Sequence, residues 1–302
     1  MWNWTKQNCD SSLLYDEYRN LDVSDDGTVV AFNGFLTPGN VPSLTVLAAQ
    51  TGKVMFEKGP ADAGAGAGTV AVSKAGAYVT WSTANGLKVY DSPTGTLRDT
   101  VSAGGPNEIS DNGAYIAGCT EDKGTIFYWD GSAYSSNFTI TPPANHPGNW
   151  FCVDVAMSSD GSGAEDSELV AFAWISQDVL TARVTVYSMV TKKILTDWVS
   201  VTNDKLQTNP TIRMDEQYVG VALWGDQDDT PTAVVLAAGS NTAIFGFTTP
   251  GSMFGVDIVV DHAASTKAMD VLYFAVAGKH VPANVMGNGG DAYAWKINVP
   301  LI

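Results

Sequence analysis

The chain has 302 residues, of which 45% are hydrophobic and only 16% are charged, so it can bury a large core and is not a disordered chain. Its formal net charge of −16 disfavours binding to nucleic acid or to an anionic membrane surface, because like charges repel. No apolar run is long enough for a transmembrane helix, and the three cysteines show no Cys-x-x-Cys spacing that would indicate a zinc site.

One short pattern recurs along the chain. An apolar stretch ends in serine, a tight turn follows, and glycine comes three residues after the serine; the copies begin at Ser24, Ser73, Ser110 and Ser158. Glycine supplies the positive φ that such a turn needs. The β-branched and aromatic run after each turn is typical of a buried strand. The four glycines lie 49, 37 and 48 residues apart, a period found in solenoids and propellers.

One period can be divided into four strands. Between residues 68 and 102 the segments "GTVAVS", "AYVTWST", "LKVYDS" and "TLRDTVS" are predicted strands, and "SPTG" is the turn between the last two. No long amphipathic helix with capping residues stands out elsewhere. The sequence therefore predicts an all-β protein.

The scheme can be followed through six approximate repeats, 18–60, 61–103, 104–147, 148–206, 207–250 and 251–302. The last repeat stops one strand short, and residues 1–8 are predicted to supply that strand, with Trp2 and Trp4 alternating as in a half-buried strand. Such a closure removes the open sheet edges. We predict a single β-propeller domain over residues 1–302, with six four-stranded blades, or seven as an alternative.

The repeats resemble the broad WD40/YVTN/PQQ-like superfamily of propeller repeats. The resemblance lies in "S-x-D-G-x-x-x-A" followed by "V-x-V-Y-D-x-x-T-G", best seen at 73–95 and 108–131. The Gly-His and Trp-Asp pairs of WD40 repeats do not recur, since Trp129-Asp130 is a single instance. The resemblance implies a propeller fold and no definite activity.

Two sets of acidic residues are candidate metal ligands. Asp226, Asp228 and Asp229 are spaced closely enough to offer several oxygens to calcium, although a solvated hairpin tip between strands is the favoured interpretation. If the protein is an enzyme, a metal in the central channel would be held by Asp154, Asp257, Asp261 and His262. No H-E-x-x-H or G-x-S-x-G motif is present, so no catalytic residue and no other cofactor is assigned.

The cysteines and sequons bear on the compartment. Cys119 and Cys152 fall on strands of neighbouring predicted blades and could form a disulfide, with three buried thiols as the alternative. Asn3 and Asn137 each begin an Asn-x-Thr sequon. Together with the scarcity of lysine and the abundance of threonine, serine and glycine, the sequons favour an extracellular protein, although residues 1–7 have neither the basic start nor the apolar stretch of a signal peptide.

The leading functional hypothesis is a non-catalytic propeller that acts as a structural or protein-interaction module and self-assembles. The alternatives are a metal-dependent hydrolase or lactonase and a glycan-binding propeller. Trp81, Trp174 and Trp224 end the second strands of three repeats, a position that favours packing between blades over a sugar site.

Overall fold

The computed structural model describes residues 21–36, 41–64, 67–145, 148–159, 168–176, 178, 181–200, 210–224, 231–281 and 290–301. In this part of the chain the regular structure consists of strands and one four-residue helix, α1 (Pro60–Ala63), which confirms the all-β prediction. None of the helical structure in these ranges has the length and apolarity needed to cross a membrane. The chain divides into two compact units, Met1–Thr120 with Gly124–Ile140 and Glu121–Lys123 with Thr141–Ile302.

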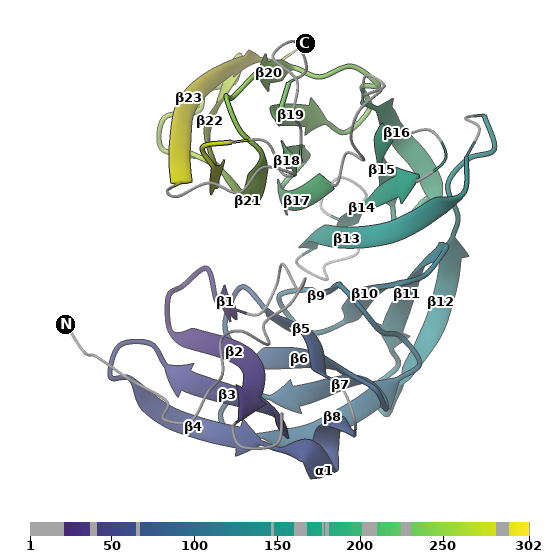
Figure 1. Cartoon of the computed structure of the whole chain (residues 1–302), viewed down its shortest axis with the longest axis vertical. Coiled ribbons are helices and arrows are strands. Elements are labelled where there is room, and N and C mark those ends of the chain that lie inside the picture. The colour runs from purple at the N-terminus through teal and green to yellow at the C-terminus, as the bar shows by residue number, and fades with distance from the viewer. Residues whose placement is uncertain are drawn as a thin grey trace. The chain divides into compact units, whose positions relative to one another are not determined.

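The described part of the first unit contains three four-stranded antiparallel sheets (Figure 1). Sheet A comprises β1 (Leu21–Val23), β2 (Val29–Leu36), β3 (Val41–Ala48) and β4 (Lys53–Lys58). Sheet B comprises β5 (Ala67–Val72), β6 (Tyr78–Thr83), β7 (Gly86–Asp91) and β8 (Thr96–Val101). Sheet C comprises β9 (Asn107–Ile109), β10 (Tyr115–Thr120), β11 (Lys123–Trp129) and β12 (Tyr134–Ile140). The four strands predicted between residues 68 and 102 are β5 to β8.

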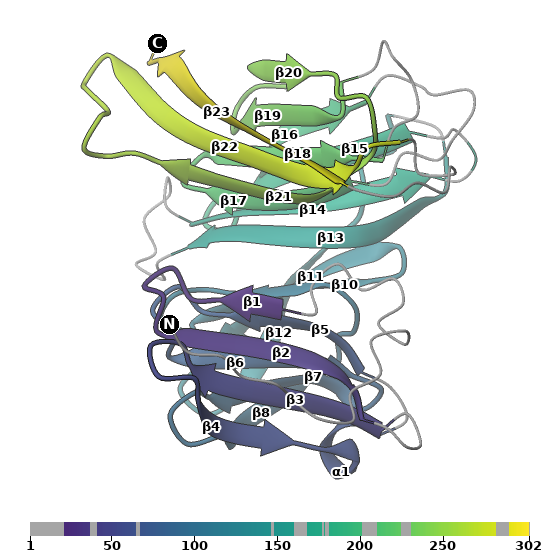
Figure 2. The same cartoon turned by 60° about the vertical axis from the view of Figure 1, so that its left-hand side comes forward.

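The described part of the second unit contains two four-stranded sheets and one three-stranded sheet (Figure 2). Sheet D comprises β13 (Trp150–Ser159), β14 (Glu168–Ser176), β15 (Thr181–Ser188) and β16 (Lys193–Val199). Sheet E comprises β17 (Pro210–Asp215), β18 (Tyr218–Leu223), β19 (Ala233–Ala237) and β20 (Phe245–Phe247). Sheet F comprises β21 (Met253–Val260), β22 (Met269–Lys279) and β23 (Gly290–Pro300), so it has three strands among the described residues. The strand predicted at residues 1–8 lies outside the described residues.

The Ser-x-x-Gly turns owe their recurrence to two local requirements. The serine hydroxyl accepts a backbone N–H from five residues on, as in the Ser73 Oγ–Tyr78 N and Ser110 Oγ–Tyr115 N bonds of 3.1 and 2.9 Å. The glycine has positive φ and lies against the preceding sheet, where a Cβ at Gly113 would come within 2.6 Å of the Tyr78 ring. Any other residue would therefore strain the turn at Gly27, Gly76 and Gly113, and at Gly76 and Gly113 it would also collide with a neighbouring side chain. The fourth glycine, Gly161, lies outside the described residues.

Within each unit, neighbouring sheets pack face to face through apolar side chains. Sheets A and B share one such cluster, sheets B and C a second, D and E a third, and E and F a fourth. Trp81 and Trp174 are completely buried, in agreement with the packing role predicted for them. Trp224 instead meets Phe254 edge-on, with ring centroids 5.2 Å apart.

Polar bonds join the innermost strands of neighbouring sheets. Between sheets A and B, the Asp22 carboxylate accepts the N–H of Val72 at 2.7 Å. The D–E and E–F junctions have the same type of bond, at 2.8 Å in both, with the pairs Asp154–Ile212 and Asp215–Val260. Between sheets B and C, an amide replaces the carboxylate, and Asn107 donates to the Thr69 hydroxyl at 2.8 Å. A directional bond thus fixes how one sheet sits on the next in every pair described within a unit.

The outer strands carry a bulge at a recurring place. In sheets A to D, the register between the third and fourth strands shifts once, which leaves one extra residue on the outer strand. These extra residues are Met55, Arg98, Asn137 and Leu195. In sheet B the extra residue reaches the following sheet, because the Arg98 guanidinium lies 4.0 Å from the ring centroid of Trp129 on sheet C.

The inner-strand carboxylates should contribute measurably to stability. Replacing Asp154 by Ala leaves the buried N–H of Ile212 without this acceptor, so we expect the free energy of unfolding to fall by about 1–3 kcal/mol. Urea unfolding of the variant measures this loss. The matched control is Asp122→Ala in an exposed turn, where a change within about 0.5 kcal/mol is expected. Equal losses in the two variants would contradict the role given to Asp154.

Candidate functional site

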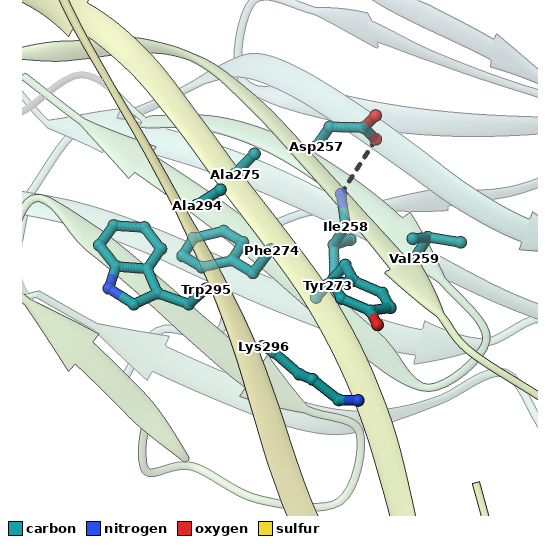
Figure 3. Close-up of a pocket in the computed structure, with 9 residues that line it drawn as sticks. All are labelled: Asp257, Ile258, Val259, Tyr273, Phe274, Ala275, Ala294, Trp295 and Lys296. Carbon is teal, nitrogen blue, oxygen red and sulfur yellow. Dashed lines mark hydrogen bonds between the residues drawn. The ribbon is translucent and has the colours of Figure 1, made fainter. Parts of the chain in front are cut away.

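The candidate site is a hollow of about 380 Å³ on sheet F (Figure 3). All three strands of the sheet line it, through Asp257, Ile258, Val259, Tyr273, Phe274, Ala275, Ala294, Trp295 and Lys296. Alternate residues of a strand point to opposite faces, so these nine residues divide into two sets. Ile258, Phe274 and Trp295 form one cross-strand row that packs toward sheet E.

The opposite face carries the open part of the hollow. Its side chains form two cross-strand rows, Asp257–Ala275–Ala294 and Val259–Tyr273–Lys296. Val259 and Tyr273 are 50% and 44% exposed, which is high for large apolar side chains in the middle of a sheet. The Lys296 ammonium lies 5.6 Å from the centroid of the Tyr273 ring, close enough for a cation–π contact at one end of the row.

Asp257 is the acidic group of this face. Its Oδ1 accepts the N–H of Ile258 at 2.9 Å, which holds the carboxylate in one orientation (Figure 3). Among the described residues, its second oxygen has no hydrogen-bond partner. The face therefore presents a fixed acceptor beside exposed apolar side chains.

Sheet D has the same arrangement of side chains on one face, but there sheet E covers that face. Asp154 accepts the N–H of Val155 with Oδ1, as Asp257 does with Ile258, and its Oδ2 accepts the N–H of Ile212 on sheet E. In register, the Asp154–Ala173 and Ala156–Ala171 pairs correspond to Asp257–Ala275 and Val259–Tyr273. All four residues of sheet D in these pairs are buried, and the three alanines belong to the cluster that joins sheets D and E. The open face of sheet F thus has the construction of a face on which another sheet packs.

The four predicted channel ligands have separate partners in the structure. Asp154 is buried, and both of its oxygens accept backbone N–H groups, whereas Asp257 lies on the open face of sheet F. Asp261 accepts the N–H groups of the two residues at 263 and 264 in its own turn. His262 is largely exposed, with Nε2 3.2 Å from Glu216 Oε1. Nowhere in the described ranges do three His, Cys, Asp or Glu side chains come together as a metal site would require.

The remaining predicted sites stay predictions. Asp226, Asp228 and Asp229 lie outside the described residues, as does Asn3. Asn137 is the extra residue at the bulge of β12 and is half-buried. Cys119 lies on β10 of the first unit and Cys152 on β13 of the second, and both side chains are buried.

Sequence reasoning missed two buried polar groups. Arg183 on β15 is completely buried and forms a two-pronged ion pair with Asp197, at 2.6 and 2.8 Å. Its position inside the apolar run "ARVTVYS" was the available signal, because an inward-facing arginine needs a partner. Tyr218 on β18 donates a 2.6 Å bond to Asp270 on β22, and burial, followed by this bond, raises its pKa. The Arg183–Asp197 pair joins two strands of sheet D, the Tyr218–Asp270 bond joins sheets E and F, and neither lines the hollow.

Comparison with known proteins identifies the fold of the chain but does not assign it to a family. No protein-family model matches the chain, and no curated protein sequence is significantly similar to it. Among solved structures, the Dos1 propeller is 11% identical with a TM-score of 0.52, and the similarity covers 86% of this chain and 71% of that one. The WD40 domain of SCAP from fission yeast is 9% identical with a TM-score of 0.51, covering 92% and 73%. Kuenenia stuttgartiensis hydrazine synthase is 12% identical with a TM-score of 0.50, covering 85% and 75%.

These similarities confirm the predicted resemblance to propeller repeats at the level of fold. The six described sheets are therefore counterparts of propeller blades. Because an enzyme and a WD40 domain are both similar to the chain at about the same level, the fold alone does not select an activity.

The Cys119–Cys152 disulfide can be tested directly. If the two cysteines are bonded, the intact mass of the native protein rises by about two hydrogens on reduction, and peptide mapping finds one peptide pair containing residues 119 and 152. A Cys152→Ser variant serves as the control, because it should show no mass change. Alkylation of all three cysteines in the unreduced native chain would exclude the bond.

Proposed function

We propose that this protein is a non-catalytic β-propeller that acts as a structural or protein-interaction module. The observation that carries the proposal is the fold, which is similar to the Dos1 propeller and to the WD40 domain of SCAP. The outer strands of its sheets also carry exposed apolar side chains, among them Val54, Leu97 and Ile194. A surface of this construction favours contact with protein over the capture of a small substrate.

The proposed molecule is a single ring of six blades, 18–60, 61–103, 104–147, 148–206, 207–250 and 251–302, with residues 1–8 as the outer strand of the last blade. Five of the described sheets have four strands and sheet F has three, with β23 at its edge. Along β23, exposed and half-buried residues alternate, and Tyr293 and Trp295 lie on the half-buried side. The alternating Trp2 and Trp4 would extend that aromatic row.

If residues 1–8 add a strand to sheet F, the amide hydrogens at that edge should be protected from exchange. Replacing Trp2 and Trp4 by alanine removes the side chains that would pack on the Tyr293–Trp295 side, so we expect faster amide hydrogen exchange in residues 290–300. The matched control is Asn3→Ala with Thr5→Ala, which changes the opposite side of an alternating strand and should have a smaller effect. Unchanged exchange in the tryptophan variant would count against residues 1–8 as the fourth strand.

We place the protein outside the cell and expect it to self-assemble. The two sequons and the scarcity of lysine support the compartment. Exposed apolar residues on the outer strands support self-assembly, since Val54, Leu97 and Ile194 all follow the turn into the fourth strand of their sheet. In sheet D, Leu195 is exposed as well.

Self-assembly can be measured by light scattering of the native material. We expect particles whose mass is a multiple of 31.9 kDa and whose population rises with concentration. Replacing Ile194 and Leu195 by aspartate adds charge at two exposed apolar positions of β16 and should shift the population toward the monomer. Ser135→Asp, on the exposed part of outer strand β12, is the control and should leave the distribution unchanged. A monomer at every concentration would refute self-assembly.

A further inference from the structure

We propose that the turn between β15 and β16 of sheet D binds an acidic surface of a second copy of this chain. The binding surface comprises residues 189–195, with the sequence "MVTKKIL", and is called the D tip below. The inference rests on the self-assembly proposed above and names the contact that self-assembly uses. That contact is head-to-tail, because the basic and apolar tip of one copy meets a different, carboxylate-bearing surface of the next.

The D tip has the same backbone turn as its counterparts in sheets A and B. The N–H of Lys192 donates to the C=O of Ser188 at 2.8 Å, and Gly52 and Gly95 donate at 2.8 Å to the residue four positions before them. The three donor residues all have positive φ, at 56° for Lys192, 68° for Gly52 and 65° for Gly95. The three turns can therefore be compared residue by residue.

This comparison shows a lysine where the other two turns have glycine. Positive φ is unfavourable for a residue with a Cβ and is readily adopted by glycine. Backbone conformations of this kind are concentrated at functional sites. The side chain of Lys192 is exposed, as is that of its neighbour Lys193. Sheet D thus presents two adjacent lysines at the tip, and one of them occupies a position that favours glycine.

The apolar side chains of the D tip are also unusual. Val190 stands where sheet A has Gln50 and sheet B has Pro93, and it is 45% exposed. Ile194 and Leu195 are 42% and 36% exposed. Consecutive residues of a regular strand point to opposite faces, but Leu195 is the extra residue at the bulge of β16. The bulge therefore allows two neighbouring apolar side chains to be exposed together.

Charge indicates which partner fits the D tip. The tip contains two lysines and no carboxylate, whereas the whole chain has 32 acidic residues, 16 lysines and arginines, and a net charge of −16. The surface of a second copy is therefore acidic on average and attracts a basic tip. A second copy also has exposed apolar side chains, such as Val54 and Leu97, that can cover those of the tip.

The same charges determine the symmetry of the contact. Two D tips repel each other, so they do not meet across a two-fold axis. When a tip instead binds a different surface, the second copy keeps its own tip available for a third copy. Such head-to-tail contacts give closed rings or open filaments, and not an isolated dimer. Because the attracting charges are exposed, the contact should weaken as the salt concentration rises.

Substitution of both lysines tests the contact. Lys192→Gly with Lys193→Thr gives the D tip the residues that sheet B has in the same two positions, Gly95 and Thr96. Glycine relieves the positive φ, so we expect the unfolding midpoint in urea to stay the same or to rise. Loss of two exposed charge contacts should raise the apparent dissociation constant of the assembly by about fivefold.

Sedimentation equilibrium measures this constant at salt concentrations of about 0.1 M and about 1 M. The matched control is Lys53→Thr with Lys267→Thr, which removes the same charge from two other exposed turns. It should leave the dissociation constant within about twofold of that of the natural chain. The tip variant should also lose most of the salt dependence.

The outcomes separate this inference from the proposal on which it rests. A natural chain that stays monomeric at every concentration refutes self-assembly and this contact with it. A natural chain that assembles, with a tip variant that assembles equally well, overturns only the role of the D tip. An assembly that stops at two copies overturns the head-to-tail arrangement.

Carbodiimide cross-linking identifies the contact directly, since it joins a lysine amine to a carboxylate that touches it. Mixing isotope-labelled and unlabelled copies distinguishes links between copies from links within one copy. We expect Lys192 or Lys193 to be joined to an Asp or Glu of the other copy. In a sample shown to be assembled, links from these two lysines that occur only within one copy would overturn the inference.

Discussion

The structure depends on a carboxylate of one inner strand that accepts a backbone N–H of the next sheet. Apolar packing between two sheets is strong but has no direction, so it alone would allow one sheet to slide on the other. The bonds of Asp22, Asp154 and Asp215 remove this freedom, because a hydrogen bond requires one distance and one orientation. The stacking of thin sheets into rigid units therefore depends on a few polar contacts near their inner strands.

This construction explains how a scaffold can present a binding face. Sheets D and F are built alike on this face, because Asp154 and Asp257 occupy corresponding positions and each accepts the N–H of the next residue. They differ in that sheet E packs on this face of sheet D. A free face of this type comes with its side chains already placed and one acceptor already oriented. Binding then costs little ordering of the surface, which favours contact between preformed sheets.

The repeats could be predicted from sequence because their causes are local. The turn at Ser73 needs its serine hydroxyl and its glycine within a few residues of each other, so the pattern can be recognised in the sequence. The positions of the flanking strands can then be predicted from the positions of the turns. The bonds between sheets could not be predicted, because Asp22 and Asp154 occupy different places in their repeats and accept from residues about 50 positions away or more. For the same reason, Asp154 was considered as a metal ligand, whereas the structure gives its oxygens backbone donors. Only the folded structure shows which carboxylates already accept hydrogen bonds from backbone N–H groups.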